Sequence, residues 1–311
     1  MQSEALLVAK KVAFLAEAFA KYPQFEAIEI ADIATADYTD AFKGVGDIIH
    51  TAAPVPGRAD AETALRSAID GSLRVLREGR KAGIKKVVVT GSIVSYPEGL
   101  FGVNDWVAIT KEQALAGNAF ALYIAEKKFG EQAVLQFADE HPDMDITISP
   151  GFEHIAPTPE GVSTFSSNGF IYQLLRPDNT NYAYSPGSID VRDVARIHIA
   201  ALNTTVPKDA RPRRVPLVSP YQTDFREALK YLYDERPELR ARLADPETAP
   251  RWTTYTLPID LKPVEEAFGY KISGFKTWKE TVLDAIDRFV KIEDSWTSKG
   301  FKFEIPREPP V

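Results

Sequence analysis

Residues 86–92 read Lys-Val-Val-Val-Thr-Gly-Ser, which is a run of three valines followed by a small residue and a hydroxyl. A short β-branched run with Gly83 before it and Gly91 after it is typical of a fully buried strand. A segment with helical periodicity, 61–82, precedes this strand, and a second apolar run, 145–149, follows it. Strands that alternate with helices predict a parallel sheet covered by helices on both faces.

The rest of the chain extends this alternation in both directions. Towards the amino terminus, the patterns predict a helix, a strand, a short helix and a strand over 4–21, 25–30, 35–42 and 47–52. After Pro157 prolines become frequent and strand signals weaken, which indicates a smaller lobe rich in helices. Further helices are expected over 190–202, 224–233 and 277–290, and the tail 305–311 is expected to be an extended surface strap.

Composition excludes several classes of protein. The net charge of −7 and the pI near 5.3 provide no basic face, so no nucleic-acid partner is predicted. No apolar run reaches the length of a membrane-spanning helix, and no signal-peptide pattern begins the chain, so no membrane partner is predicted. The absence of cysteine removes disulfides and thiolate chemistry, and we expect a cytoplasmic protein.

Tyr123 and Lys127 are four residues apart in a predicted helix, so their side chains lie on one face. A free phenol has a pKa of about 10, and a neighbouring ammonium favours the phenolate and moves that pKa towards about 7. Such a tyrosine can pass a proton to a carbonyl oxygen. Ser92, at the end of the valine strand, can donate a hydrogen bond to the same oxygen. Because no side chain supplies hydride, this chemistry implies a nicotinamide cofactor.

Each of these residues also has a purely structural interpretation. A Tyr and a Lys at this spacing occur by chance in many helices. Asp190 and Arg192, at the start of a predicted helix, are interpreted as a cap and a salt-bridge partner. Trp106 either lines a substrate pocket or anchors its loop. No metal site is predicted, because no ligand spacing relates the four histidines, His50, His141, His154 and His198.

At these residues the chain resembles an extended short-chain dehydrogenase/reductase of the NAD-dependent epimerase/dehydratase superfamily. The similar branch contains dihydroflavonol reductases, cinnamoyl-CoA reductases and fungal aldehyde or ketone reductases. The resemblance runs from Phe25 to Val290. Its motifs are Asp32-Ile33, the stretch 47–54, Gly71-Ser72, 87–92, Asp105-Trp106, Tyr123-x3-Lys127, 150–152 and 190–195, and the late Gly269.

The resemblance implies a Rossmann-like doubly wound parallel sheet with a smaller α/β carboxyl-terminal lobe. Residues 1–157 would form the dinucleotide-binding domain and 158–311 the substrate-binding lobe, with part of 183–219 returning to the main domain. It further implies reduction of an aldehyde or ketone, with Ser92, Tyr123 and Lys127 as the catalytic triad.

The same resemblance implies an NADP(H) site and a substrate site. Residues expected along the cofactor, besides Tyr123 and Lys127, are Asp32, Ile33, Ala52, Ala53, Pro54, Thr90, Pro150 and Phe152. Residues expected near the substrate, besides Ser92 and Tyr123, are Ile93, Trp106 and Phe152.

The family's Gly-x-x-Gly-x-x-Gly turn occurs nowhere in the 311 residues. This turn and the helix behind it normally hold the pyrophosphate, so NADP(H) binding is expected to be impaired. The alternative function is therefore a catalytically silent reductase-fold protein. For the sheet, we expect strand 25–30 to move across and pair directly with strand 47–52, and helix 4–21 to pack against one face.

Overall fold

The computed structural model divides into two compact units by its contacts. The first unit holds residues 1–87 and 109–146, and the second holds 88–108 and 147–311. The described residues are 15–30, 32–53, 60–150, 168–182, 188–211, 213–250 and 259–307, with side chains omitted at 149 and 150.

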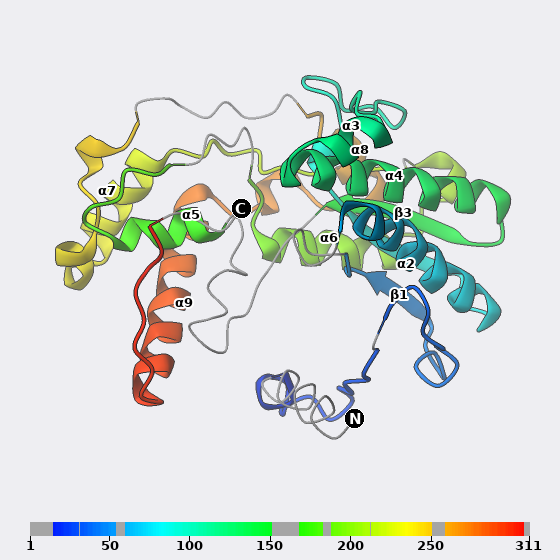
Figure 1. Cartoon of the computed structure of the whole chain (residues 1–311), viewed down its shortest axis with the longest axis horizontal. Helices are drawn as coiled ribbons and strands as arrows, with labels where there is room; N and C mark the ends of the chain where they lie inside the picture. The colour runs from blue at the N-terminus through cyan, green and yellow to red at the C-terminus, as the bar shows by residue number, and fades with distance from the viewer. Residues whose placement is uncertain are drawn as a thin grey trace. The chain divides into compact units, whose positions relative to one another are not determined.

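Among the described residues, three strands form a sheet in the order β1-β2-β3. The strands are β1 (Asp47–His50), β2 (Lys86–Gly91) and β3 (Asp145–Pro150). The three valines of β2 are all buried, as the apolar run predicts. Beyond β3, Arg214 forms a parallel bridge with Ile148. Helices connect consecutive strands, so the predicted α/β, Rossmann-like fold is confirmed (Figure 1).

In the first unit, α2 (Ala61–Lys81) and α4 (Ala119–Glu140) lie against each other (Figure 1). Each begins at a polar cap: Asp60 accepts from the amide of Thr63, and Asn118 accepts from the amide of Ala121. The short α3 (Lys111–Ala116) precedes α4. Small side chains let these helices approach closely, and the core between them comprises Ala64, Leu65, Ala114, Leu122 and Ala125.

In the described part of the second unit, buried apolar residues form two clusters. One joins α5 (Asn168–Tyr172), α7 (Phe225–Glu235) and α9 (Trp278–Ser298). The other joins α6 (Val191–Asn203) and α8 (Lys262–Phe268) to Val88 of β2. The short 3-10 helices are η1 (Ile93–Ser95), η3 (Gln173–Leu175), η4 (Lys208–Ala210), η5 (Pro237–Arg242), η6 (Pro246–Thr248) and η7 (Ile272–Gly274).

Two predicted elements near the amino terminus are wrong. The segment 25–30 is not a strand: it lacks regular structure, and Phe25 and Ile28 are exposed. Its apolar alternation lacks a neighbouring strand in the described residues, and the predicted pairing with β1 is absent, since β1 neighbours only β2 there. The segment 35–42 forms turns and not a helix, because Asp37 binds the amide and hydroxyl of Thr39 and competes with helical bonds.

The remaining predicted elements match those observed, with shifts of a few residues at their ends and a longer α9. Of the predicted helix 4–21, residues 4–14 lie outside the described residues; 15–18 are helical, and 16–20 are exposed, so this described part does not pack on the sheet. The tail begins as the predicted strap, because the carbonyl of Pro306 accepts from Arg176. The division at 157 into cofactor and substrate domains stays a prediction.

Candidate active site

Tyr123 and Lys127 lie one turn apart on α4 in the first unit. The Lys127 ammonium is 5.7 Å from the centroid of the Tyr123 ring, so both side chains point to one side of the helix. Burial lowers the pKa of Lys127, and the carboxyls of Glu131 and Glu126 partly oppose that shift. A desolvated ammonium beside a half-buried phenol is the arrangement that favours the phenolate.

A buried acid and a buried base accompany this lysine. Burial raises the pKa of Glu126 to about 7, and the Lys127 charge acts in the opposite direction. Burial and the same ammonium lower the pKa of His50 to about 4. His50 Nε2 lies 3.2 Å from the Ser72 hydroxyl, which donates to the Ala68 carbonyl; the imidazole is therefore the donor, with its proton on Nε2.

Ser92 lies in the second unit, at the junction of β2 and η1. Its backbone is extended, and its hydroxyl oxygen accepts from the Val94 amide at 3.4 Å, so Ser92 caps the 3-10 turn. Only 4% of the residue is exposed. The Ser95 hydroxyl donates to the Ser92 carbonyl at 2.7 Å and holds the backbone of Ser92 in place. Ile93, the predicted substrate neighbour, begins η1 and is half-buried.

Trp106 is an anchor of the loop that follows Ser92. Its ring lies 3.6 Å from the guanidinium carbon of Arg214, and the Tyr96 ring lies 3.5 Å from the same carbon. The sequence left two interpretations of Trp106 open, and this stack establishes the anchoring one. A substrate contact on the opposite face of the indole stays a prediction.

Thr90, predicted to lie along the cofactor, is bound to His198 of α6. The Thr90 hydroxyl is 3.0 Å from His198 Nε2, and His198 Nδ1 is 2.8 Å from the Val194 carbonyl. Because a carbonyl only accepts, Nδ1 carries the proton and Nε2 accepts from Thr90. Burial lowers the pKa of His198, which keeps the imidazole neutral. The hydroxyl of Thr90 therefore has a fixed direction.

The other predicted cofactor residues have different surroundings. Asp32 is exposed, and its carboxylate closes a turn by accepting from the Ala34 amide and the Thr35 hydroxyl. The Ile33 side chain packs against Gly71 of α2. Exposed residues follow the end of β1 at Ala52 and Ala53. Pro54 and Phe152 lie outside the described residues, as does the side chain of Pro150.

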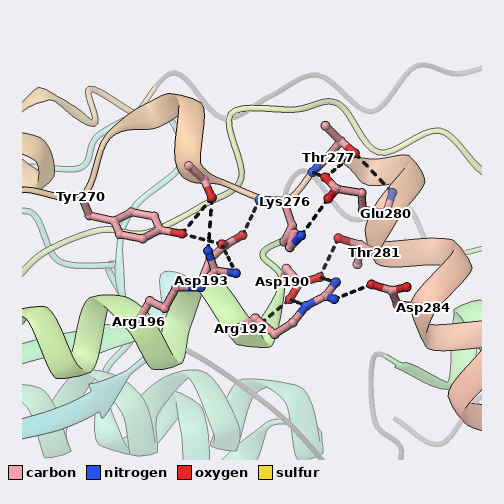
Figure 2. Close-up of polar contacts among 11 residues, drawn as sticks. Asp190, Arg192, Asp193, Arg196, Tyr270, Lys276, Thr277, Glu280, Thr281 and Asp284 are labelled. Atoms are coloured by element: carbon pink, nitrogen blue, oxygen red, sulfur yellow. Dashed lines mark hydrogen bonds and ion pairs between the residues drawn. The ribbon is translucent and has the colours of Figure 1, made fainter.

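The Asp-Val-Arg-Asp motif at 190–193 forms a polar network between α6 and α9 (Figure 2). Asp190 caps α6 and binds Arg192, which also pairs with Asp284 of α9. Asp193, fully buried, accepts from the Tyr270 hydroxyl at 2.7 Å and the Lys276 amide at 2.9 Å. These contacts confirm the cap and the salt bridge as structural, because each carboxylate is already bound by groups of the second unit.

The structure thus pairs Tyr123 with Lys127 in the first unit and gathers Thr90, Ser92 and Trp106 in the second. Sequence reasoning missed Arg214. Its signal in the sequence is weak, because Arg214 follows Arg211 and Arg213 and directly precedes the apolar stretch Val-Pro-Leu-Val at 215–218.

Metal-binding clusters and membrane-spanning helices can be assessed over the described ranges. There, no three His, Asp or Glu side chains gather as a group that can hold a metal ion. None of the helices in this part of the chain combines the length and apolarity needed to cross a membrane.

Comparison with known proteins finds relatives of this chain by sequence and solved structures with the same fold. The ketoreductase adrE of Penicillium rubens is 30% identical over 196 residues, which is 58% of this chain and 57% of the relative. The putative NADPH-dependent methylglyoxal reductase GRP2 of Candida albicans is 29% identical over 265 residues, covering 77% of this chain and 76% of the relative.

Among solved structures, yeast methylglyoxal/isovaleraldehyde reductase Gre2 complexed with NADPH superposes with a TM-score of 0.71 at 23% identity. The match covers 92% of this chain and 90% of Gre2. The model of the NAD dependent epimerase/dehydratase family matches residues 5–211, about two thirds of the sequence. The chain therefore belongs to the NAD dependent epimerase/dehydratase family.

Proposed function

We propose that this protein reduces an aldehyde or a ketone with NADPH, using Tyr123, Lys127 and Ser92. The observation that carries the proposal is the Lys127 ammonium, partly desolvated, 5.7 Å from the Tyr123 ring centroid on one side of α4. Membership of the family and the names of its relatives, a ketoreductase and a putative methylglyoxal reductase, support the same reaction class.

Each residue has a separate role. The Tyr123 hydroxyl donates its proton to the carbonyl oxygen of the substrate, and the Lys127 ammonium stabilises the phenolate left behind. Ser92 donates a hydrogen bond to that oxygen as negative charge develops on it. NADPH, when bound, supplies the hydride that the carbonyl carbon receives. The product is an alcohol, with its new C–H hydrogen from the cofactor and its O–H hydrogen from Tyr123.

Several described residues fit a nicotinamide dinucleotide. Ala52 and Ala53 follow the carboxyl end of β1, are exposed, and carry no side chain that obstructs a ligand. Thr90 is the last residue but one of β2, and because its hydroxyl donates to His198, its oxygen is left to accept from a ligand. Lys127 offers ammonium donors suited to ribose hydroxyls. We propose that these residues hold the cofactor, together with Asp32, Ile33, Pro54, Pro150 and Phe152.

Exchange of Tyr123 for Phe tests the proposal. A panel of aliphatic and aromatic aldehydes is reduced with millimolar NADPH by wild type and by Tyr123→Phe. Turnover should fall about 100-fold or more, because the proton donor is lost while the ring remains. Tyr221→Phe is the matched control: it removes an exposed hydroxyl in the second unit and should leave the rate unchanged.

The outcomes separate the two functions. Equal rates for wild type and Tyr123→Phe, with matching unfolding midpoints, would exclude the triad. A wild type that binds NADPH and reduces no aldehyde in the panel would instead support the alternative of a catalytically silent reductase-fold protein.

A further inference from the structure

Arg214 is held in place through its backbone and through its guanidinium. Its backbone lies beside β3, because the Arg213 carbonyl accepts from the Ile148 amide at 2.8 Å and the Val215 amide donates to the Ile148 carbonyl at 3.0 Å. Its guanidinium lies between the rings of Tyr96 and Trp106. Only 1% of Arg214 is exposed, so the guanidinium is enclosed, whereas Trp106 is half-buried.

The guanidinium also binds the backbone of the loop that follows Ser92. Nη1 donates to the Asp105 carbonyl at 2.6 Å, and Nη2 donates to the Ser95 hydroxyl at 2.8 Å. That hydroxyl in turn donates to the Ser92 carbonyl at 2.7 Å. A continuous chain of hydrogen bonds therefore runs from Arg214 through Ser95 to the residue proposed to polarise the substrate.

The same loop is closed across its base. The Val107 amide donates to the Ser95 carbonyl at 3.0 Å, so the start and the end of the loop 95–107 meet beside the guanidinium. The hydrogen bonds at the tip join residues of the loop itself: the Gly102 amide donates to Asp105 Oδ2 at 2.6 Å, and the Asp105 amide donates to the Gly102 carbonyl at 3.0 Å. Leu100 and Val103 are exposed there. The position of the loop consequently depends on the contacts at its base, where Arg214 binds one residue from each side.

We propose that Arg214 is a positioning residue, which fixes Ser92 and the orientation of Trp106 and thereby selects the shape of carbonyl substrate accepted. The inference rests on the proposed reductase function for its substrate, and on the contacts of the second unit for its geometry. Because one face of the indole is covered by the guanidinium, only the other face of Trp106 can contact a substrate.

Lysine cannot replace this arginine. A planar guanidinium stacks on two rings and donates in two fixed directions at once, whereas an ammonium is a point charge on a flexible stem. Arg214→Lys keeps the charge and removes the stack and the fork. The loop 95–107 should then open more often, while the rest of the second unit stays folded.

Limited digestion with chymotrypsin measures this opening without any ligand. The loop contains Leu100, Phe101 and Trp106 as cleavage sites, whereas the Tyr96-Pro97 bond resists chymotrypsin, and fragments are identified by mass. Cleavage there should be about tenfold faster or more in Arg214→Lys, since brief opening is measured as a population and tenfold corresponds to about 1.4 kcal/mol. Arg226→Lys is the matched control, because Arg226 also donates to backbone carbonyls, at Glu247 and Ala249.

A second readout follows specificity. The ratio of kcat/KM for a bulky aromatic aldehyde to that for a small aliphatic aldehyde should change in Arg214→Lys and stay constant in Arg226→Lys. A residue that only stabilises the fold would lower both values alike. If Arg214→Lys does not fold, Ser95→Ala breaks the same chain of hydrogen bonds at its middle member. This variant is then tested by digestion and by the ratio of kcat/KM values.

The outcomes are distinct from those for the proposed function. Faster cleavage confined to the loop supports the inference even if no variant reduces an aldehyde, in which case the proposed function alone fails. A loop cleaved no faster than in Arg226→Lys, or an unchanged substrate ratio in an active enzyme, overturns it.

Discussion

Replacing Gly71 of α2 by Ala should destabilise the protein when Ile33 is present and stabilise it when Ile33 is replaced by Ala. A Cβ at this position would lie 2.7 Å from Ile33 Cδ1 and 2.9 Å from Ile33 Cγ1. Carbon atoms in good contact are about 3.5 to 4.0 Å apart, so both atoms would overlap the new methyl.

The magnitude follows from two opposing effects. Replacing Gly by Ala within a helix stabilises by roughly 0.5 to 1 kcal/mol, because the unfolded chain loses conformational freedom. Overpacking a closely fitted contact costs about 1 to 3 kcal/mol. Gly71→Ala should therefore lower the free energy of unfolding by about 1 kcal/mol. In an Ile33→Ala background both overlapping atoms are gone, and the same change should stabilise by about 0.5 kcal/mol.

Urea denaturation of the four proteins in this cycle, wild type, both single variants and the double variant, measures the free energy of unfolding directly. The coupling between the two sites should be about 1.5 kcal/mol and should favour the double variant. A Gly71→Ala effect of the same sign and size in both backgrounds would refute the contact between Ile33 and α2.

Three further predictions follow. Asp193→Ala should lower the free energy of unfolding by about 3 kcal/mol or more in urea denaturation, because the Lys276 amide and the Tyr270 hydroxyl lose a charged acceptor. Asp193→Asn should lower it clearly less, and equal decreases for the two variants would contradict this. Burial raises the pKa of Glu126 to about 7 from its ordinary 4.5, so the free energy of unfolding should decline by up to about 3 kcal/mol as pH rises from below 4.5 to above 7. Glu126→Gln should abolish this decline when urea denaturation is compared at pH values of about 5 and 8. Calorimetry should give a millimolar or undetectable NADPH affinity for these 311 residues, and a micromolar constant would show that another segment replaces the glycine turn.

The helices and strands that the sequence predicted correctly are those whose apolar pattern or capping residue is used within the element itself. The apolar run of β2 is buried as expected, and α6 begins at the Asp190 cap that its sequence indicates. The segment 25–30 has an equally good strand pattern, yet a strand needs a hydrogen-bonding neighbour, and alternation alone does not reveal whether one is present.

Contacts between candidate site residues were predictable where those residues are close in sequence. Tyr123 and Lys127 are one helical turn apart, so helix geometry alone brings them together. Arg214 binds Ser95 and Trp106 across more than 100 residues of chain, and no periodicity encodes such a contact. The raised pKa of Glu126 was also not predictable from the sequence pattern, because it depends on how the folded chain buries this carboxyl.

The strap at residues 305–307 is held by hydrogen bonds to its backbone carbonyls. The Pro306 carbonyl accepts from Gln173 and Arg176, and the Arg307 carbonyl accepts from the Asn181 side-chain amide at 2.7 Å. Every residue type provides a carbonyl, so substitutions at 306 and 307 preserve the acceptors. Natural variation should therefore be tolerated in the identity of these two residues, whereas a deletion that shortens the reach of the strap would remove all of its bonds to 173–181 together.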